Sequence, residues 1–312
     1  MSQSRRHKWQ ICMCVLWTVQ SLAQEILQFR DAKPDVEVLA GTETLCVLRP
    51  DVGPFPFFHP VRAPGGRIVT RPVLGLDAPD HAKYDHPHHR GLWFTHGDVN
   101  GCDFWSLGHG IIRQEGPAET DAQRRALCTT NVWLAEDRPC LRDIREWLVW
   151  DLTRDHYILE FRVTLQALDS PVTFGDTKEG SLAIRLTDDL RADPPGRGRI
   201  QTADGHTGRD AWGKLSRWCL YSTDDIGVLI MDHPRNPRAS AWHVRTYGLF
   251  AANPFGRKSF GLATEPQPFQ LPSRSSTTFV WAICIVRGQV DARCADELWR
   301  RWATDSVSRA GK

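Results

Sequence analysis

A histidine-rich segment in the first third of the chain holds the densest group of side chains able to exchange protons. It runs from Asp85 to Trp105, and five of the twelve histidines lie between His81 and His96. Imidazole changes its charge near neutral pH, which suits it to general acid–base catalysis and to binding divalent metals. The catalytic candidates are four of these histidines and one carboxylate from a later segment: His86, His88, His89, His96 and Glu179.

A divalent metal is an alternative use of the same histidines. On an extended chain His86 and His88 project to the same side, and a third ligand could come from His96, Asp98 or a distant residue. No standard metal motif is matched, and histidines that cap turns are the structural alternative. The chain contains no glycine-rich nucleotide loop and no nucleophile elbow, which argues against nucleotide cofactors and α/β-hydrolase chemistry.

Two later segments add charged side chains. The turn 175–180 carries Lys178 beside the candidate carboxylate, and it leads into a strand. In the third segment, 231–248, alternation places His243 and Arg245 on one face of a strand. The substrate-binding candidates from all three segments are Arg90, Trp93, Asp98, Asn100, Lys178, Arg185, His233, Asn236, His243 and Arg245.

Strand patterns dominate the elements that must position these residues. In His156–Leu168, apolar residues recur at every second position from Tyr157 to Leu165, as in a half-buried strand. Thr277–Val286 is apolar on both faces, which is typical of a central strand between two layers. The other predicted strands are 35–40, 43–49, 67–71, 92–97, 124–134, 143–151, 181–187, 217–222, 227–232 and 242–248.

Helical spacing is found in one place, from Asp291 to Thr304. Closely spaced strands with a single helix predict an all-β fold, a large antiparallel β-sandwich with one C-terminal helix. As a fold-level analogy, this type is similar to the galactose mutarotase-like supersandwich, in which a histidine and a carboxylate lie on a concave sheet face.

The N-terminus has the pattern of an export signal. Residues 5–8 are basic, residues 11–19 are mostly apolar, and small residues precede a cleavage point after Ala23. We therefore expect a signal peptide over residues 1–23, a periplasmic or secreted protein, and one β-sandwich domain over residues 24–312. A retained membrane anchor is the alternative, and no later segment is long enough to span a membrane.

Composition limits the partners. The net charge of +2 gives no reason to expect nucleic-acid binding. Seven of the nine cysteines lie after the predicted signal, and none forms a CxxC pair there, which argues against a cysteine zinc site. The thirteen tryptophans either pack a core or form platforms for sugar rings.

A family resemblance rests on Asp85–Trp105, Gly175–Arg185 and Gly227–Gly256. In these segments the chain resembles the PmoA-like domain family of bacteria, over roughly residues 30–290. The resemblance implies a protein without a membrane span, of a kind met in bacteria with large sets of sugar-processing enzymes. The family's label, methane oxygenase, adds a metal-dependent oxygenase as an alternative.

Two hypotheses follow for the function. The sequence favours an exported carbohydrate-active enzyme that acts on a sugar or sugar derivative by histidine and carboxylate acid–base chemistry, as an epimerase, lyase or hydrolase. A non-catalytic glycan-binding β-sandwich is the alternative, and either would take a small-molecule or oligosaccharide ligand. Convergence of the three segments favours the enzyme, whereas dispersal over the surface favours the binding module.

Overall fold

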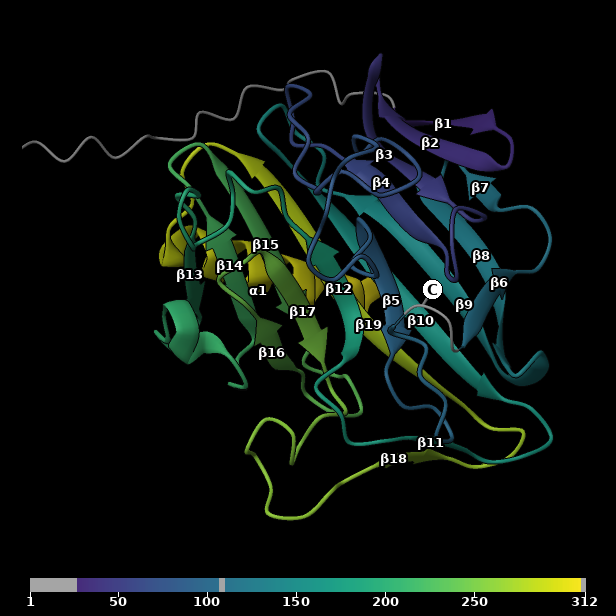
Figure 1. The fold of residues 1–312 in the computed structure, drawn as a ribbon. Coiled ribbons are helices and arrows are strands. Elements are labelled where there is room, and N and C mark those ends of the chain that lie inside the picture. The colour runs from purple at the N-terminus through teal and green to yellow at the C-terminus, as the bar shows by residue number, and fades with distance from the viewer. Residues whose placement is uncertain (1–26, 107–109, 310–312) are drawn as a thin grey trace, which may run out of the picture.

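Two large antiparallel sheets pack face to face in the computed structural model, which describes residues 27–106 and 110–309 (Figure 1). The signal peptide predicted at residues 1–23 lies outside the described residues. The first sheet has the order β1 (Leu27–Ala32), β2 (Asp35–Ala40), β3 (Glu43–Arg49), β4 (Phe57–Val61), β5 (Leu92–His96), β12 (Gly180–Arg185), β17 (Leu249–Asn253) and β16 (Ala241–Val244).

The second sheet has nine strands, one more than the first, and lies behind the first sheet in the view of Figure 1. Its order is β13 (Arg199–Thr202), β14 (Trp218–Ser222), β15 (Ile226–Asp232), β19 (Ser276–Arg287), β10 (His156–Ala167), β9 (Arg138–Trp150), β8 (Ala126–Ala135) and β6 (Ile111–Gln114). Three short strands complete the set: β7 (Glu119–Asp121) pairs with β8, and β11 (Val172–Phe174) pairs with β18 (Phe269–Leu271). A 3-10 turn, η1 (Gly208–Ala211), precedes β14.

Aromatic rings fill the space between the sheets. Phe94 of β5 packs against Phe161 and Trp281 of the second sheet, with ring centroids 5.5 and 6.0 Å apart. Nine of the described tryptophans are buried, so these nine do not form exposed platforms for sugar rings.

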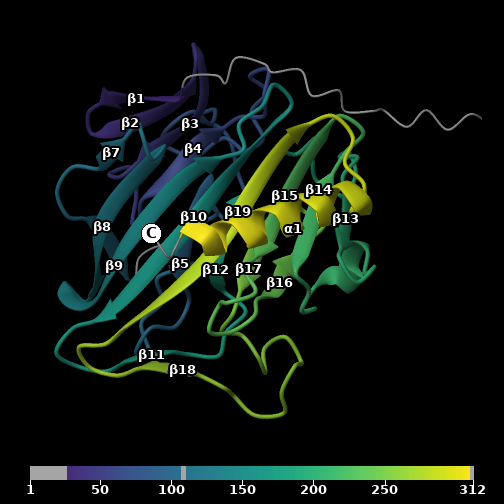
Figure 2. The same ribbon diagram turned by 180° about the vertical axis from the view of Figure 1, so that it is seen from behind.

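The helix α1 (Ala292–Arg309) crosses the outer face of the second sheet (Figure 2). Its Trp302 is fully buried, and the indole Nε1 donates to the Glu160 carboxylate of β10 at 2.7 Å. No helix within the described ranges has the length and apolar character needed to cross a membrane.

The sequence-based prediction of an all-β sandwich with one C-terminal helix is confirmed, but two predicted strands differ. Segment 67–71 forms only isolated bridges, such as Thr70 to Leu186. The strand predicted over 242–248 ends at Val244. Residues 245–248 form a turn, which Gly248 closes with a φ of +95°. The returning strand β17 was not predicted.

Candidate active site

The outer face of the first sheet is the surface that carries the candidate chemistry. Because side chains alternate along a strand, Phe94 points into the sandwich while Trp93 and Thr95 of β5 point away from it. Register pairs Thr95 with Ser181 and Trp93 with Ala183, so these residues of β5 and β12 share one face. We call this surface the outer face.

A loop between residues 71 and 91 folds over the outer face and carries three clustered imidazoles. His86 stacks on His89 with ring centroids 4.8 Å apart, and His88 meets His89 edge-on at 4.5 Å. We call these three residues the imidazole cluster. At its end Gly91 has a φ of +54°, and a Cβ there would lie 2.1 Å from the Phe58 carbonyl oxygen, so only glycine fits where the loop enters β5.

Two buried guanidinium groups hold the loop through one carboxylate. Arg71 donates to Asp85 Oδ1 at 2.6 Å, and Arg185 at the end of β12 donates to the same carboxylate at 2.8 and 3.1 Å. The two arginine side chains are only 3% and 1% exposed, whereas Asp85 is half-exposed. Burial would raise the pKa of Asp85, but the His86 hydrogen bond and the two arginine charges outweigh it and lower the pKa to about 2.

The carboxylate of Asp85 also orients His86. His86 Nδ1 lies 3.0 Å from Asp85 Oδ2, and since an ionised carboxylate can only accept, Nδ1 carries the proton. In its neutral form the ring therefore presents Nε2 as a proton acceptor. His86 is partly exposed, and its backbone φ of +48° is unusual for a residue with a side chain. A carboxylate–imidazole pair on a strained loop is typical of a general base.

The surroundings of His88 and His89 favour the neutral forms of these two imidazoles. Arg185 Nη1 lies 3.2 Å from His89 Nδ1, and because a guanidinium only donates, the proton of His89 is on Nε2. Burial and the neighbouring charges of His88 and Arg185 lower the pKa of His89 far below its usual range. Burial and the charge of His86 also lower the pKa of the half-buried His88.

Residues from the later segments reach the same face. Tyr247 stacks on His86 at 5.2 Å and lies under the guanidinium of Arg185 at 4.7 Å. Burial raises the pKa of Tyr247, so its phenol stays protonated. The Glu179 carboxylate, paired with Lys178, acts electrostatically on both His88 and Tyr247.

His243 of β16 extends the face beyond β17. It is 2% exposed, and its ring lies 6.4 Å from that of Trp105. Burial and the charges of Arg245 and Lys178 lower its pKa to about 3. The three predicted segments therefore meet on one surface, which connects His86, Arg185 and His243 through shared neighbours.

Several buried polar atoms of the outer face have no hydrogen-bond partner within residues 27–106 and 110–309. They are Trp93 Nε1, Thr95 Oγ1, Trp105 Nε1, Ser181 Oγ and His243 Nδ1. Buried polar groups in folded proteins are nearly always satisfied by protein, water or ligand. Hydroxyl, indole and imidazole groups gathered on one sheet face suit a polar, hydroxyl-rich ligand.

Four predicted residues of the first segment lie away from the imidazole cluster. His96 points into the sandwich, where Nε2 contacts the Gly175 carbonyl at 2.9 Å and burial lowers its pKa to about 4. Asp98 and Asn100 tie the following turn to neighbouring backbone groups. Arg90 donates to the Val52 carbonyl at 2.6 Å.

Two residues of the third segment lie on the opposite side of the molecule. The His233 ring meets Trp302 of α1 with centroids 5.3 Å apart. Asn236 donates to Asp232 and to the Val280 carbonyl, each at 2.8 Å, and so braces the turn after β15. The site proposed below includes neither of them.

The predicted metal ligands do not share a site. His96 is on the inner side of β5, whereas His86 and His88 are on the loop over the outer face. Within the described ranges, no group of three or more His, Cys, Asp or Glu side chains is arranged to hold an ion.

Sequence reasoning left out Arg71, Asp85, Trp105 and Tyr247 as site residues. Asp85 and Trp105 bound the histidine-rich segment, and Tyr247 continues the alternation of His243 and Arg245, so each has a signal in its position. Arg71 had none, because a lone arginine in a loop carries no pattern. Its role depends on a contact with Asp85, fourteen positions along the chain.

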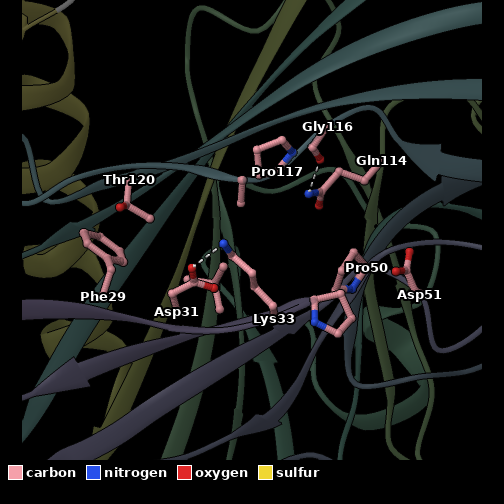
Figure 3. A pocket seen from close by; sticks show the side chains of 12 residues that line it. Phe29, Asp31, Lys33, Pro50, Asp51, Gln114, Gly116, Pro117 and Thr120 are labelled. Atoms are coloured by element: carbon pink, nitrogen blue, oxygen red, sulfur yellow. Dashed lines mark hydrogen bonds and ion pairs between the residues drawn. The ribbon is translucent and has the colours of Figure 1, made fainter.

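A separate hollow of about 530 Å³ lies beside the N-terminal strands (Figure 3). Phe29, Pro50 and Pro117 line it, and Lys33 reaches toward Asp31 at 3.4 Å. Of the described residues that line it, none is a histidine or belongs to the outer face. This hollow therefore contributes nothing to the chemistry of the candidate site.

Comparison with known proteins corrects one expectation. The model of a family of unknown function (DUF6807) matches residues 36–300. The predicted PmoA-like resemblance is therefore wrong, and the oxygenase alternative that rested on its label is dropped. No curated protein matches the chain. Among solved structures, the chain is similar to a crystal structure of a heparan sulfate lyase HepC mutant from Pedobacter heparinus, at 14% identity and a TM-score of 0.30. The match covers 82% of this chain and 34% of that one, so this chain spans about a third of that protein's length.

Proposed function

We propose a function from the premise that the chain belongs to the family of unknown function DUF6807, so that its chemistry has to be argued from its own site. The protein is an enzyme that acts on a sugar or a sugar derivative by proton transfer at the outer face. Epimerases, lyases and hydrolases of sugars share such a step. Export to the periplasm or beyond, with the predicted signal at residues 1–23, belongs to the same proposal.

The observation that carries the proposal is the Asp85–His86 pair, which lies over the sheet face whose buried polar atoms have no partner among the described residues. Asp85 holds the proton on His86 Nδ1 and leaves Nε2 as the base, while two buried arginines keep Asp85 ionised. The protonated phenol of Tyr247, stacked on His86, is placed to return a proton to the product. Thr95, Ser181 and Trp105 offer hydrogen bonds to substrate hydroxyls.

The test is proton exchange and bond cleavage on a panel of sugars and sugar acids. Incubation in D₂O followed by ¹H NMR detects epimerase and lyase chemistry, and new reducing ends detect hydrolysis. On a substrate found this way, we expect His86→Gln to lower kcat by on the order of a hundredfold or more, the usual contribution of a general base. We expect Glu179→Gln to lower it less.

The matched control is His81→Gln, because His81 is exposed and lies in the same loop region. It should retain wild-type turnover. Full turnover in His86→Gln would refute the assigned base. Ligand binding without exchange or cleavage by the wild-type protein would favour the glycan-binding module instead.

A further inference from the structure

Arg245 differs from the other cations of the site in its electrostatic partners. Arg71 and Arg185 share Asp85, and Lys178 is paired with Glu179. Arg245 follows β16 and is half-buried, and its guanidinium carbon lies 4.8 Å from the ring centre of Trp212. Of the carboxylates in the described ranges, none makes an ion pair with it. Among the described residues, the guanidinium of Arg245 thus has no ion-pair partner, and its fork-shaped donors face no carboxylate of the protein.

A second observation places a binding function beside this cation. His243, two residues earlier, is 2% exposed, and its Nδ1 has no partner among the described residues. The neighbouring Trp105 is 1% exposed, and its Nε1 is also without a partner. Burying such groups costs free energy unless a ligand or water satisfies them. Both belong to the face that also bears the imidazole cluster.

The local charges select the kind of ligand. Asp85 is neutralised by two arginines, and Glu179 is neutralised by Lys178. Asp188 acts on Arg71, but it is paired with Arg191 at 3.6 Å. Asp103 acts on His88, but its Oδ1 accepts from the Trp105 and Ser106 backbone N–H groups. One unpaired guanidinium fits a monoanion, and its planar fork matches a carboxylate.

We propose that Arg245 binds the carboxylate of an acidic sugar, such as a uronate, with His243 and Trp105 contacting the adjacent ring oxygens. This inference rests on the proposed function, because it names the substrate class of that site. The sugar ring then lies between Arg245 and the imidazole cluster. Tyr247 stacks on His86, and the charge of Arg245 acts on its phenol, so it is coupled to both.

The test compares acidic and neutral sugars of matched stereochemistry by isothermal titration calorimetry. The pairs are glucuronate with glucose and galacturonate with galactose, measured at low and at physiological salt. We expect one acid to bind at least about tenfold more tightly than its neutral partner. In Arg245→Gln the preference should fall by about tenfold to a hundredfold, which corresponds to the loss of a charge-assisted hydrogen bond.

Two further variants separate binding from folding. Arg245→Lys keeps the charge but loses the fork, so we expect intermediate affinity for the acid. Arg199→Gln removes an exposed arginine of β13, which is paired with Asp224. This variant should leave the preference for the acidic sugar unchanged. A thermal melt of each variant identifies any that does not fold, and the lysine variant then carries the test.

The outcomes separate this inference from the proposed function. Equal affinity for acid and neutral sugars, no binding of either acid, or an unchanged preference in Arg245→Gln would overturn the role of Arg245. Turnover of a neutral sugar that depends on His86 would leave the proposed function standing without this inference. Tight, Arg245-dependent binding of an acid without any turnover would support the inference and count against the enzyme.

Discussion

Asp85 is the residue on which two buried guanidinium groups depend. It is half-exposed, but Arg71 and Arg185 are almost fully buried behind it. Asp85→Asn would remove the ion-pair partner of both arginines, and breaking a buried ion pair is strongly destabilising. We expect it to lower the free energy of unfolding by about 2–4 kcal/mol, measured by urea denaturation.

An exposed ion pair provides the control for this substitution. Asp169 and Arg274 are 87% and 79% exposed and 3.0 Å apart. We expect Asp169→Asn to change the free energy of unfolding by less than about 0.5 kcal/mol. If Asp85→Asn and Asp169→Asn lower the free energy of unfolding by the same amount, the account of a carboxylate shared by two buried arginines is incorrect.

The buried imidazoles make stability depend on pH. His89 and His243 have pKa values lowered in the folded state, mainly by burial, that of His243 to about 3. Below the ordinary value of 6.5, the unfolded chain binds these protons and the folded chain does not, so stability is lost as the pH falls. We expect each to contribute a slope of up to about 1.4 kcal/mol per pH unit between about pH 6 and pH 5.

Urea denaturation at several pH values checks this slope. His89→Gln and His243→Gln remove one titrating group each, so each should flatten the dependence. His81→Gln removes an exposed imidazole and should leave the slope as it is. A slope that both buried variants retain would place the acid sensitivity elsewhere in the protein.

At the level of elements, alternation along strands was readable from the sequence, and contacts between distant loops were not. Alternation along β5 puts Trp93 opposite Phe94, and the contacts of these two rings agree with it. Pro60 masks the strand pattern of β4, because proline is unusual within a sheet. The turn at Gly248 ends β16 earlier than the alternation of His243 and Arg245 indicates.

His96 illustrates why residue type alone did not define the site. It follows the same alternation as Phe94, which sends it to the inner side of β5 toward Phe255. Its histidine identity suggested catalysis, while its position in the strand already indicated burial. The Arg71–Asp85–Arg185 contact left no periodic signal, because it joins two loop residues to the end of a strand.

The helix α1 is held to the second sheet by a buried hydrogen bond as well as by apolar contact. Trp302→Phe keeps most of the ring but removes the donor to Glu160, whose side chain is 2% exposed. Among the described side chains, Arg162 would then remain as the partner of Glu160, at 2.6 Å. We expect a loss of about 1–3 kcal/mol in the free energy of unfolding, measured by urea denaturation.

The same helix supplies the comparison. Arg300 is 67% exposed and pairs with Asp296 at 3.5 Å, so Arg300→Gln should cost less than about 0.5 kcal/mol. Equal stability of Trp302→Phe and the wild type would mean that Glu160 is satisfied without the indole.

At the scale of the whole molecule, no disulfide contributes to the stability of the described residues. Its seven cysteines are free thiols, and Cys46, Cys219 and Cys284 are buried. We expect the melting temperature to change by less than about 1 °C when dithiothreitol is added, whereas loss of a native disulfide would lower it by several degrees.

Thiol labelling gives an independent check of the same expectation. Cys102, Cys128, Cys140 and Cys294 are partly accessible and should react with a thiol reagent before the three buried cysteines. A clear drop of the melting temperature under reducing conditions, together with fewer reactive thiols after denaturation, would show that a disulfide forms.

Arg185 and Asp85 stand one hundred positions apart, and they meet only when β5 and β12 pair in the correct register. A slip of one residue in β5 would turn Trp93 toward the core and bring Phe94 to the outer face beside Arg185. A molecule with a misaligned central sheet therefore has no place for a ligand. Recovery of ligand affinity during refolding should accordingly report a correctly aligned sheet, and an immobilised ligand would separate such molecules from compact but misaligned ones.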